Sequence, residues 1–301
     1  MNTKQVMCAV LAICCGAGFC GCGKPLSEPD PADFSGMLTE LTTEAPPQET
    51  TTTADPYLSR TADTRSGGKL IHGVPHISQI DSYLTACETL SAVELLQYYG
   101  IEISPEEFID LYLPVTDYPQ WQASDNQLHG ESPWEYFLGD PMAADAYGCY
   151  NTVIAAALNS VTDGLAIQLD KVPLEELCRT YIDKGQPLII WATMQMAETF
   201  DGNSWILPNG DKYTFTCPEH ALLLIGYDDE YYYFSDSLQE EEITAYSKES
   251  VEKAYAAMYS MAIGIRSEPE VLQAAAICIQ KDLEADEALP VEEPEDLNAA
   301  A

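Results

Sequence analysis

The sequence is poor in positive charge. Its 301 residues include 13 Lys and Arg against 49 Asp and Glu, which gives a formal net charge of −36. A nucleic-acid binder needs a basic surface that displaces counterions from phosphates, and so few cations cannot form one. Adsorption to an anionic membrane surface is disfavoured for the same reason. We therefore expect no nucleic acid among the partners of this protein.

Motifs for metals and nucleotides are also missing. The chain has four His, and neither HExxH nor CxxC spacing occurs, so the sequence does not predict a zinc site. His72 and His76 fall in a strand-like segment, and His129 falls in a polar loop. The glycines form no phosphate-binding loop. We expect no metal ion and no cofactor.

No apolar run is long enough to predict a permanent transmembrane helix. Residues 6–20 are apolar or small and follow Lys4, which is typical of the core of a signal peptide. The segment resembles a bacterial lipoprotein signal, which implies that residues 1–21 are removed and that Cys22 carries the lipid. Cys20 is the alternative lipidation site, and an ordinary signal peptide is the alternative signal. The resemblance implies export and a lipid anchor on the outer face of the bacterial cell membrane.

Both ends of the chain differ in composition from its middle. Residues 22–66 are rich in Thr, Pro and Glu, and they hold too little apolar surface to offset the entropy of ordering. We expect this segment to be a disordered tether. Residues 268–301 are strongly acidic and predict a solvated tail, with one helix around 271–280. One folded domain is expected between them, over residues 67–267.

The middle of the chain predicts an α+β fold. Helical patterns come first and strand patterns dominate the second half, so a set of alternating βαβ units is not expected. N-terminal helices would then pack on an antiparallel sheet. We expect helices at 90–100, 149–161 and 173–185, and strands at 70–78, 165–169, 186–194, 212–216, 220–229 and 230–236.

A cysteine lies at the start of the first of these helices. Thr85 and Glu88 have the spacing of a capping box, which predicts Thr85 as the N-cap and Cys87 as the second helical residue. Backbone N–H groups are unpaired in the first turn of a helix, and both they and the helix dipole stabilise a thiolate there. Cys87 is therefore a candidate nucleophile. The alternative is a small buried apolar residue.

A histidine and an aspartate lie in a predicted hairpin. His220 opens an apolar run, the turn signal of Asp228 and Asp229 follows, and a second strand leads to Asp236. If the turn centres near Asp229, the numbers of paired residues sum to about 458, and His220 and Asp236 share one face near the open end. Asp236 would then orient the imidazole. The alternative is a surface hairpin with a polar end.

The order of these residues resembles that of a known family. Gln79 lies just upstream of the Cys helix, where its amide could donate to an oxyanion. The order Gln, Cys, His, Asp is that of papain-like cysteine peptidases. Four blocks resemble the bacterial C-39-like peptidases, which are related to the double-glycine bacteriocin leader peptidases. The blocks are VPHISQIDSYLTACETLSAVELLQYYG, GDPMAADAYGCYNTVIAAALN, QPLIIWATM and EHALLLIGYDDEYYYFSDSL.

The resemblance implies a papain-like fold and roles for four residues. Cys87 would be the nucleophile, His220 the base, Asp236 the orienting acid and Gln79 the oxyanion donor. The substrate would be a peptide or protein, and no cofactor would be needed. Ala86, Glu219 and Ser237 differ from the residues that the family often has at these positions.

Two other function classes are compatible with the sequence. One is a non-catalytic module on the same fold that binds peptide or cell wall, and the other is a thiol amidase or transpeptidase that acts on cell-wall peptides. The oligomeric state is also left open. An exported chain could hold up to two disulfides among its remaining cysteines, which are Cys149, Cys178, Cys217 and Cys278.

Overall fold

The computed structural model describes residues 68–80 and 82–266. Cys22, the predicted tether, the acidic tail and the helix expected around 271–280 lie outside the described residues. The predicted domain bounds of 67 and 267 therefore stay a prediction. Within the described part of the chain, no helix is both long and apolar enough to cross a bilayer.

An antiparallel sheet forms the centre of the fold. Its strands follow the order β12-β11-β10-β7-β13-β6, and β1 pairs with β10. Strand β7 is buried throughout and β10 is buried in all but its last residue, Tyr227, as expected for apolar runs at the centre of a sheet. The bounds are β1 Lys69–Leu70, β6 Ala166–Gln168, β7 Leu188–Thr193, β10 Glu219–Tyr227, β11 Tyr231–Ser235, β12 Thr244–Ser247 and β13 Ala262–Ile265.

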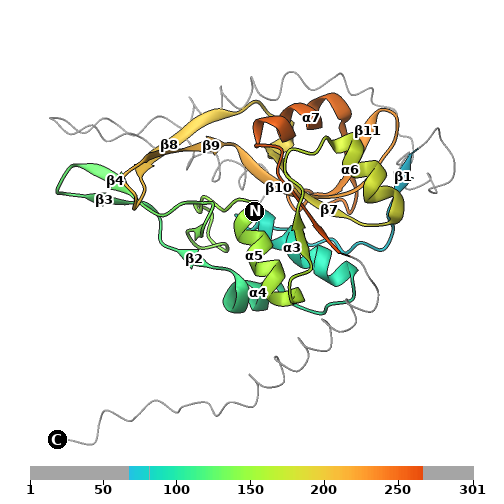
Figure 1. The fold of residues 1–301 in the computed structure, drawn as a ribbon, viewed down its shortest axis with the longest axis horizontal. Helices are drawn as coiled ribbons and strands as arrows, with labels where there is room; N and C mark the ends of the chain where they lie inside the picture. The colour runs from blue at the N-terminus through green and yellow to red at the C-terminus, as the bar shows by residue number, and fades with distance from the viewer. Residues whose placement is uncertain (1–67, 81, 267–301) are drawn as a thin grey trace, which may run out of the picture. The chain divides into compact units, whose positions relative to one another are not determined.

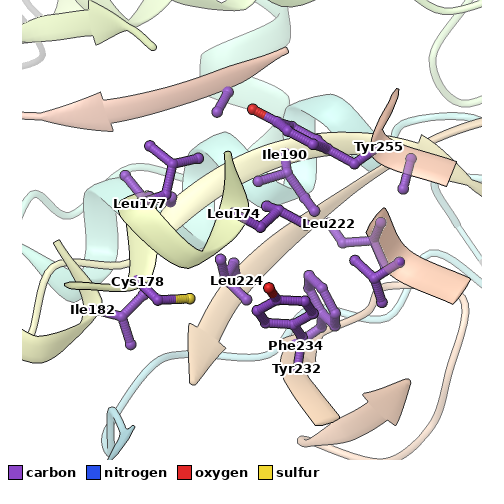
Figure 2. Packing of buried hydrophobic residues seen from close by; sticks show 14 of the residues in the cluster. Leu174, Leu177, Cys178, Ile182, Ile190, Leu222, Leu224, Tyr232, Phe234 and Tyr255 are labelled. Carbon is purple, nitrogen blue, oxygen red and sulfur yellow. The ribbon is translucent and has the colours of Figure 1, made fainter. Parts of the chain in front are cut away.

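Helices cover both faces of this sheet. Figure 1 shows α6 and α7 on one side of β7 and β10, with α3, α4 and α5 on the other. Leu222 and Leu224 of β10 pack with Leu177 of α6 and Tyr255 of α7 in the cluster drawn in Figure 2. The helices are α3 Cys87–Tyr98, α4 Pro105–Tyr112, α5 Asn151–Thr162, α6 Leu174–Thr180 and α7 Lys248–Ala257, with short 3-10 turns at η1 Ile182–Lys184 and η2 Met194–Met196.

A second sheet extends from the first. Its strand order is β3-β4-β8-β9, and a separate pair, β2 with β5, is parallel. Strand β9 ends at Cys217, which leads through Pro218 directly into β10 and so into the site. The bounds are β2 Val115–Thr116, β3 Gln120–Gln122, β4 Gln127–His129, β5 Phe137–Leu138, β8 Phe200–Ile206 and β9 Lys212–Cys217.

The strand predicted over residues 70–78 is mostly wrong. The structure keeps only β1, and the N–H of Ile71 makes one further bond to the carbonyl oxygen of Ile225 at 2.8 Å. Gly73 then adopts a φ of +75°, which is outside the range of a strand and turns the chain away from the sheet. The rest of the segment therefore runs as a loop toward α3.

Three of the four cysteines within residues 68–80 and 82–266 are free. Cys87, Cys149 and Cys178 carry free thiols and are buried, whereas Cys217 is disulfide-bonded. Cys278 lies outside the described residues. Two disulfides among the four non-nucleophilic cysteines, as the sequence allowed, are therefore excluded, because Cys149 and Cys178 take part in none.

Candidate active site

Helix α3 begins at Cys87, one residue later than its capping signal predicts. Its N-cap is Ala86, and no side chain caps it. The Thr85 hydroxyl donates instead to the carbonyl oxygen of Ala143 at 2.9 Å, so it ties the loop before the helix to a neighbouring segment. The capping-box prediction is wrong because both of its side chains are used in tertiary contacts. Cys87 is still in the first turn, where the helix dipole favours an anion.

The Cys87 sulfur lies at the edge of strand β10. The backbone N–H of Ala221 donates to Sγ at 3.5 Å. The first pair between β10 and β11 is Leu223 with Ser235, so Ala221 lies beyond that ladder and its N–H is available to the sulfur. Successive side chains of a strand point to opposite faces. The side chains of Glu219 and His220, which come just before Ala221, therefore point to opposite faces of the sheet, and the Glu219 carboxyl lies close to the sulfur.

His220 and Asp236 form a buried pair. Nε2 of His220 lies 2.8 Å from Oδ1 of Asp236, and the two side chains are 0% and 1% exposed. The pairing of Leu223 with Ser235 has the register that the sequence predicts for this hairpin. Because the other ring nitrogen, Nδ1, is buried and makes no hydrogen bond within the described residues, it is the one left to exchange a proton.

Two further groups hold the Asp236 carboxylate. The Leu238 N–H donates to Oδ1 at 3.0 Å, and the Tyr246 hydroxyl donates to Oδ2 at 2.7 Å. Burial alone would raise the pKa of Asp236, but the interaction with His220 and these hydrogen bonds lower it below its ordinary value. Asp236 is therefore a fixed negative charge that orients the imidazole and stabilises its protonated form.

Gln79 links the cysteine segment to the aspartate segment. Its side-chain Nε2 donates to the carbonyl oxygen of Leu84 at 3.0 Å, and its Oε1 accepts from the Ser237 hydroxyl at 2.6 Å. Its backbone N–H donates to the Ser237 carbonyl at 2.9 Å. One hydrogen of the amide remains for another acceptor, since a side-chain amide has two. Gln79 is thus held between the residue after Asp236 and the loop before Cys87.

The surroundings of the sulfur oppose its ionisation. Burial raises the pKa of Cys87 well above its ordinary value, and the nearby carboxyl groups of Glu88 and Glu219 raise it further, while the Ala221 N–H acts in the opposite direction. The start of a helix led us to expect a stabilised thiolate. The structure differs because two carboxyl groups and a dry environment outweigh the helix dipole. Cys87, Glu88 and Glu219 are also the described residues whose ligand atoms lie close enough to hold a metal ion.

Residues 71–263 match the model of the Peptidase_C39 like family. The chain belongs to this family. It is 25% identical over 180 residues to the uncharacterized protein YvpB of Bacillus subtilis (strain 168), a match that covers 60% of this chain and 68% of YvpB.

A solved structure supports the same assignment. The crystal structure of a Bacillus anthracis protein assigned as a C39-like peptidase superposes with a TM-score of 0.59 at 27% identity, covering 66% of this chain and 98% of that chain. The family resemblance and the papain-like α+β fold predicted from the sequence are confirmed. The lipoprotein form stays a prediction, because Cys22 lies outside the described residues.

Sequence reasoning missed three residues of this C39-like site. The sequence pattern predicts a helix cap at Glu88 and only a departure from the family pattern at Glu219, but both are buried next to the sulfur. Tyr246, which binds Asp236, was not singled out at all. For Glu88 a signal existed, since a charged residue directly after a candidate nucleophile acts on its pKa. For Tyr246 none existed, because only the pairing of β11 with β12 brings it to the site.

Proposed function

We propose that this C39-like chain is a surface-anchored cysteine peptidase that hydrolyses peptide bonds. One observation carries the proposal: the Cys87 sulfur accepts the N–H of the residue directly after His220, and His220 is paired with a buried Asp236. A thiol beside an imidazole that a carboxylate orients is the arrangement of nucleophilic acyl transfer. The family membership and the Bacillus anthracis protein assigned as a C39-like peptidase support the same reaction.

The reaction needs only groups of this chain and water. The S–H proton of Cys87 moves to Nδ1 of His220, and the electron pair left on sulfur attacks the peptide carbonyl carbon. Gln79 and the Cys87 N–H donate to the oxyanion that forms. The imidazolium then gives its proton to the leaving amine as the C–N bond breaks. Water hydrolyses the thioester, which releases the acid and restores the thiol.

The test is hydrolysis that depends on Cys87. We expect the full-length protein to cleave denatured casein and a mixture of random quenched-fluorescent peptides, and Cys87→Ala to abolish this cleavage because it removes the nucleophile. The matched control is Cys178→Ala, which removes another buried free thiol that packs in the core cluster of α6. That variant should keep its activity. Cleavage is followed by fluorescence and by mass spectrometry of the products.

Three results would contradict the proposal. Cleavage that survives in Cys87→Ala would assign the reaction to another group. Hydrolysis of purified muropeptides without hydrolysis of linear peptides would identify a cell-wall amidase. Binding of peptides or muropeptides without any cleavage would identify a binding module on the same fold.

The anchor is a separate part of the proposal. We expect a bacterial host that lipidates exported proteins to attach an alkyne-labelled palmitate to the full-length chain, and Cys22→Ala to remove the label because it removes the acceptor thiol. Cys20→Ala, two residues away, is the control and should keep the label. Labelling is read on a gel after coupling to a fluorophore. Label that persists in Cys22→Ala but is lost in Cys20→Ala would move the anchor to Cys20.

A further inference from the structure

Two carboxyl groups flank the nucleophile. The Cys87 thiol donates to Oε2 of Glu88 at 3.3 Å, while Oε1 of Glu88 accepts the Cys149 N–H at 2.7 Å. A ligand atom of Glu219 completes a cluster whose members all lie within 4.8 Å of one another. Gly148 leaves the space for this arrangement, because a Cβ there would lie 2.2 Å from Glu88 Oε1 and 3.4 Å from Glu219 Oε2.

Nothing described around the two carboxyl groups balances two negative charges. Glu88 and Glu219 are 0% and 6% exposed, and none of the ion pairs within residues 68–80 and 82–266 involves either of them. Oε1 of Glu219 is buried and has no hydrogen-bond partner in the part of the chain that the structure describes. Two carboxylates this close in a dry environment cannot both be ionised at low cost, and a single proton between them removes the repulsion.

The neighbouring groups on each packed element leave this conclusion unchanged. Helix α3 supplies Cys87, the residues that lead into α5 supply Cys149 and Tyr150, and β9 supplies Tyr213. Burial keeps these four groups neutral, because it raises the pKa of each thiol and each phenol. Strand β7 supplies the uncharged indole of Trp191, which interacts with Glu219.

His220 of β10 is the nearby group that can become a cation. His220 is already paired with Asp236, so its positive charge is largely balanced there and stabilises Glu88 and Glu219 only weakly. The positive charge needed to balance two carboxylates is therefore missing from the described surroundings.

We propose that Glu88 and Glu219 hold one proton between them, with the negative charge on Glu88, and that this charge keeps the resting Cys87 in its thiol form. Glu88 carries the charge because its two oxygens accept the Cys149 N–H and the Cys87 S–H, whereas Glu219 has a hydrogen bond with the Trp191 indole and its Oε1 has no partner among the described residues. The nucleophile then has two competing neighbours. Glu88 holds its proton on sulfur, and His220 Nδ1 takes that proton when the S–H bond breaks during catalysis.

The control of the nucleophile by Glu88 rests on the proposed peptidase function. The protonation state of the Cys87 thiol can be measured whether or not the protein is a peptidase. Glu88→Gln is the informative variant, because the amide oxygen still accepts from Cys149 while the amide N–H now points at the sulfur. The hydrogen bond is reversed and the negative charge is gone. Both changes favour the thiolate, so the pKa of Cys87 should fall.

The experiment measures the rate at which iodoacetamide alkylates Cys87 of the full-length protein as a function of pH, by peptide mass spectrometry. We expect Glu88→Gln to lower the midpoint by at least about one pH unit, which is a tenfold rise in thiolate fraction. The nucleophilicity of a thiolate falls with its pKa, so alkylation at neutral pH should be about threefold faster. Cys149 and Cys178 are labelled only on unfolding, so their protection in the same spectra shows that the variant is folded.

A double-variant cycle tests the shared proton. If one charge is shared, Glu88→Gln combined with Glu219→Gln should shift the midpoint little further than Glu88→Gln alone. Two independent charges would give additive shifts and overturn the proposal, as would an unchanged midpoint in Glu88→Gln. Glu94→Gln is the matched control on the same helix, and it should leave the midpoint unchanged.

Two further arms separate the remaining explanations. The first arm treats the unmutated protein with EDTA. If its alkylation rate then equals that of Glu88→Gln, a divalent cation and not a proton balances the two carboxyl groups. That result would overturn the proposal. Peptide hydrolysis measured on the same samples separates the two proposals. If Glu88→Gln shifts the alkylation midpoint but the unmutated protein hydrolyses no peptide, only the proposed peptidase function is contradicted. If peptides are hydrolysed but the midpoint does not shift, only the proposal of a shared proton is contradicted.

Discussion

His220→Ala is expected to lower kcat/KM for peptide hydrolysis by about 10²- to 10⁴-fold, the usual contribution of a general acid–base group. The imidazole is needed twice, to accept the thiol proton and to give a proton to the leaving amine. Within the described residues Asp236 binds His220 and not Cys87, so the carboxylate does not replace the missing ring. The measurement is kcat/KM on the random peptide mixture.

The same variant should also be much less stable. It leaves the Asp236 carboxylate, whose side chain is 1% exposed, without its partner. Removal of one member of a buried ion pair costs about 3–5 kcal/mol. Adding Asp236→Asn removes the unpaired charge, while the Asn oxygen still accepts from the Leu238 N–H. We therefore expect the double variant to recover most of the free energy of unfolding and none of the activity.

Urea denaturation measured by Trp fluorescence, together with kcat/KM, tests both parts. The double variant is the control for folding, since its loss of activity cannot be attributed to an unfolded chain. A kcat/KM within tenfold of the unmutated protein in His220→Ala would mean that another group is the base. Equal stability of the single and double variants would mean that the buried charge of Asp236 is balanced elsewhere.

The free energy of unfolding is expected to fall as the pH rises from 5 to 8, and Glu94 is one identifiable cause. Its carboxyl is 1% exposed on α3 and accepts the Ile77 N–H at 2.7 Å. Burial raises its pKa from 4.5 to about 8, although its hydrogen bonds with Ile77 and Ser235 act in the opposite direction. In the unfolded chain the same group ionises near its ordinary pKa.

The sign follows from the bound proton. Between pH 4.5 and about 8 the folded protein keeps this proton and the unfolded chain has lost it. The contribution of Glu94 to stability is therefore full below pH 4.5, where both states are protonated, and it is lost as the pH approaches about 8. Each pH unit in this window lowers the free energy of unfolding by about 1.4 kcal/mol. A domain of ordinary stability has only about 5–15 kcal/mol in total, so the effect is large.

Glu94→Gln isolates this contribution. The amide is neutral at every pH and its oxygen still accepts from Ile77, so the variant should equal the unmutated protein at pH 5 and be the more stable of the two at pH 8. The control is Glu102→Gln, which removes an exposed carboxylate. Urea midpoints at half-unit steps of pH provide the data. Parallel stability curves for Glu94→Gln and the unmutated protein would show that Glu94 does not keep its proton on folding.

Local pattern predicted the hairpin that carries the base, but its register only at the end that holds the site. Leu223 pairs with Ser235, as the predicted sum of about 458 requires, whereas a bulge between Leu224 and Gly226 shifts the pairing near the turn by one residue. The cap of α3 could not be predicted in this way. Thr85 and Glu88 have the right spacing, but their side chains bind Ala143 and Cys149, which are distant in sequence.

The burial of α3 likewise could be predicted only in part from local pattern. Its apolar spacing predicts one buried face, yet every residue from Cys87 to Leu96 is buried, including Glu88 and Glu94. A hydrophobic pattern reports which side chains prefer the interior. It does not report that a helix is packed on several sides, and that packing places charged groups in a dry environment.

The sequence by itself determined the family, the α+β class and the order of Gln79, Cys87, His220 and Asp236, because these depend on residue type, spacing and strand alternation. Only the tertiary structure decided what surrounds the sulfur. Helix α3, the segment at Cys149 and strand β10 meet there from separate parts of the chain, and they bring two carboxyl groups against one thiol. Electrostatic energy depends on distance and burial in space, which spacing along the chain does not specify.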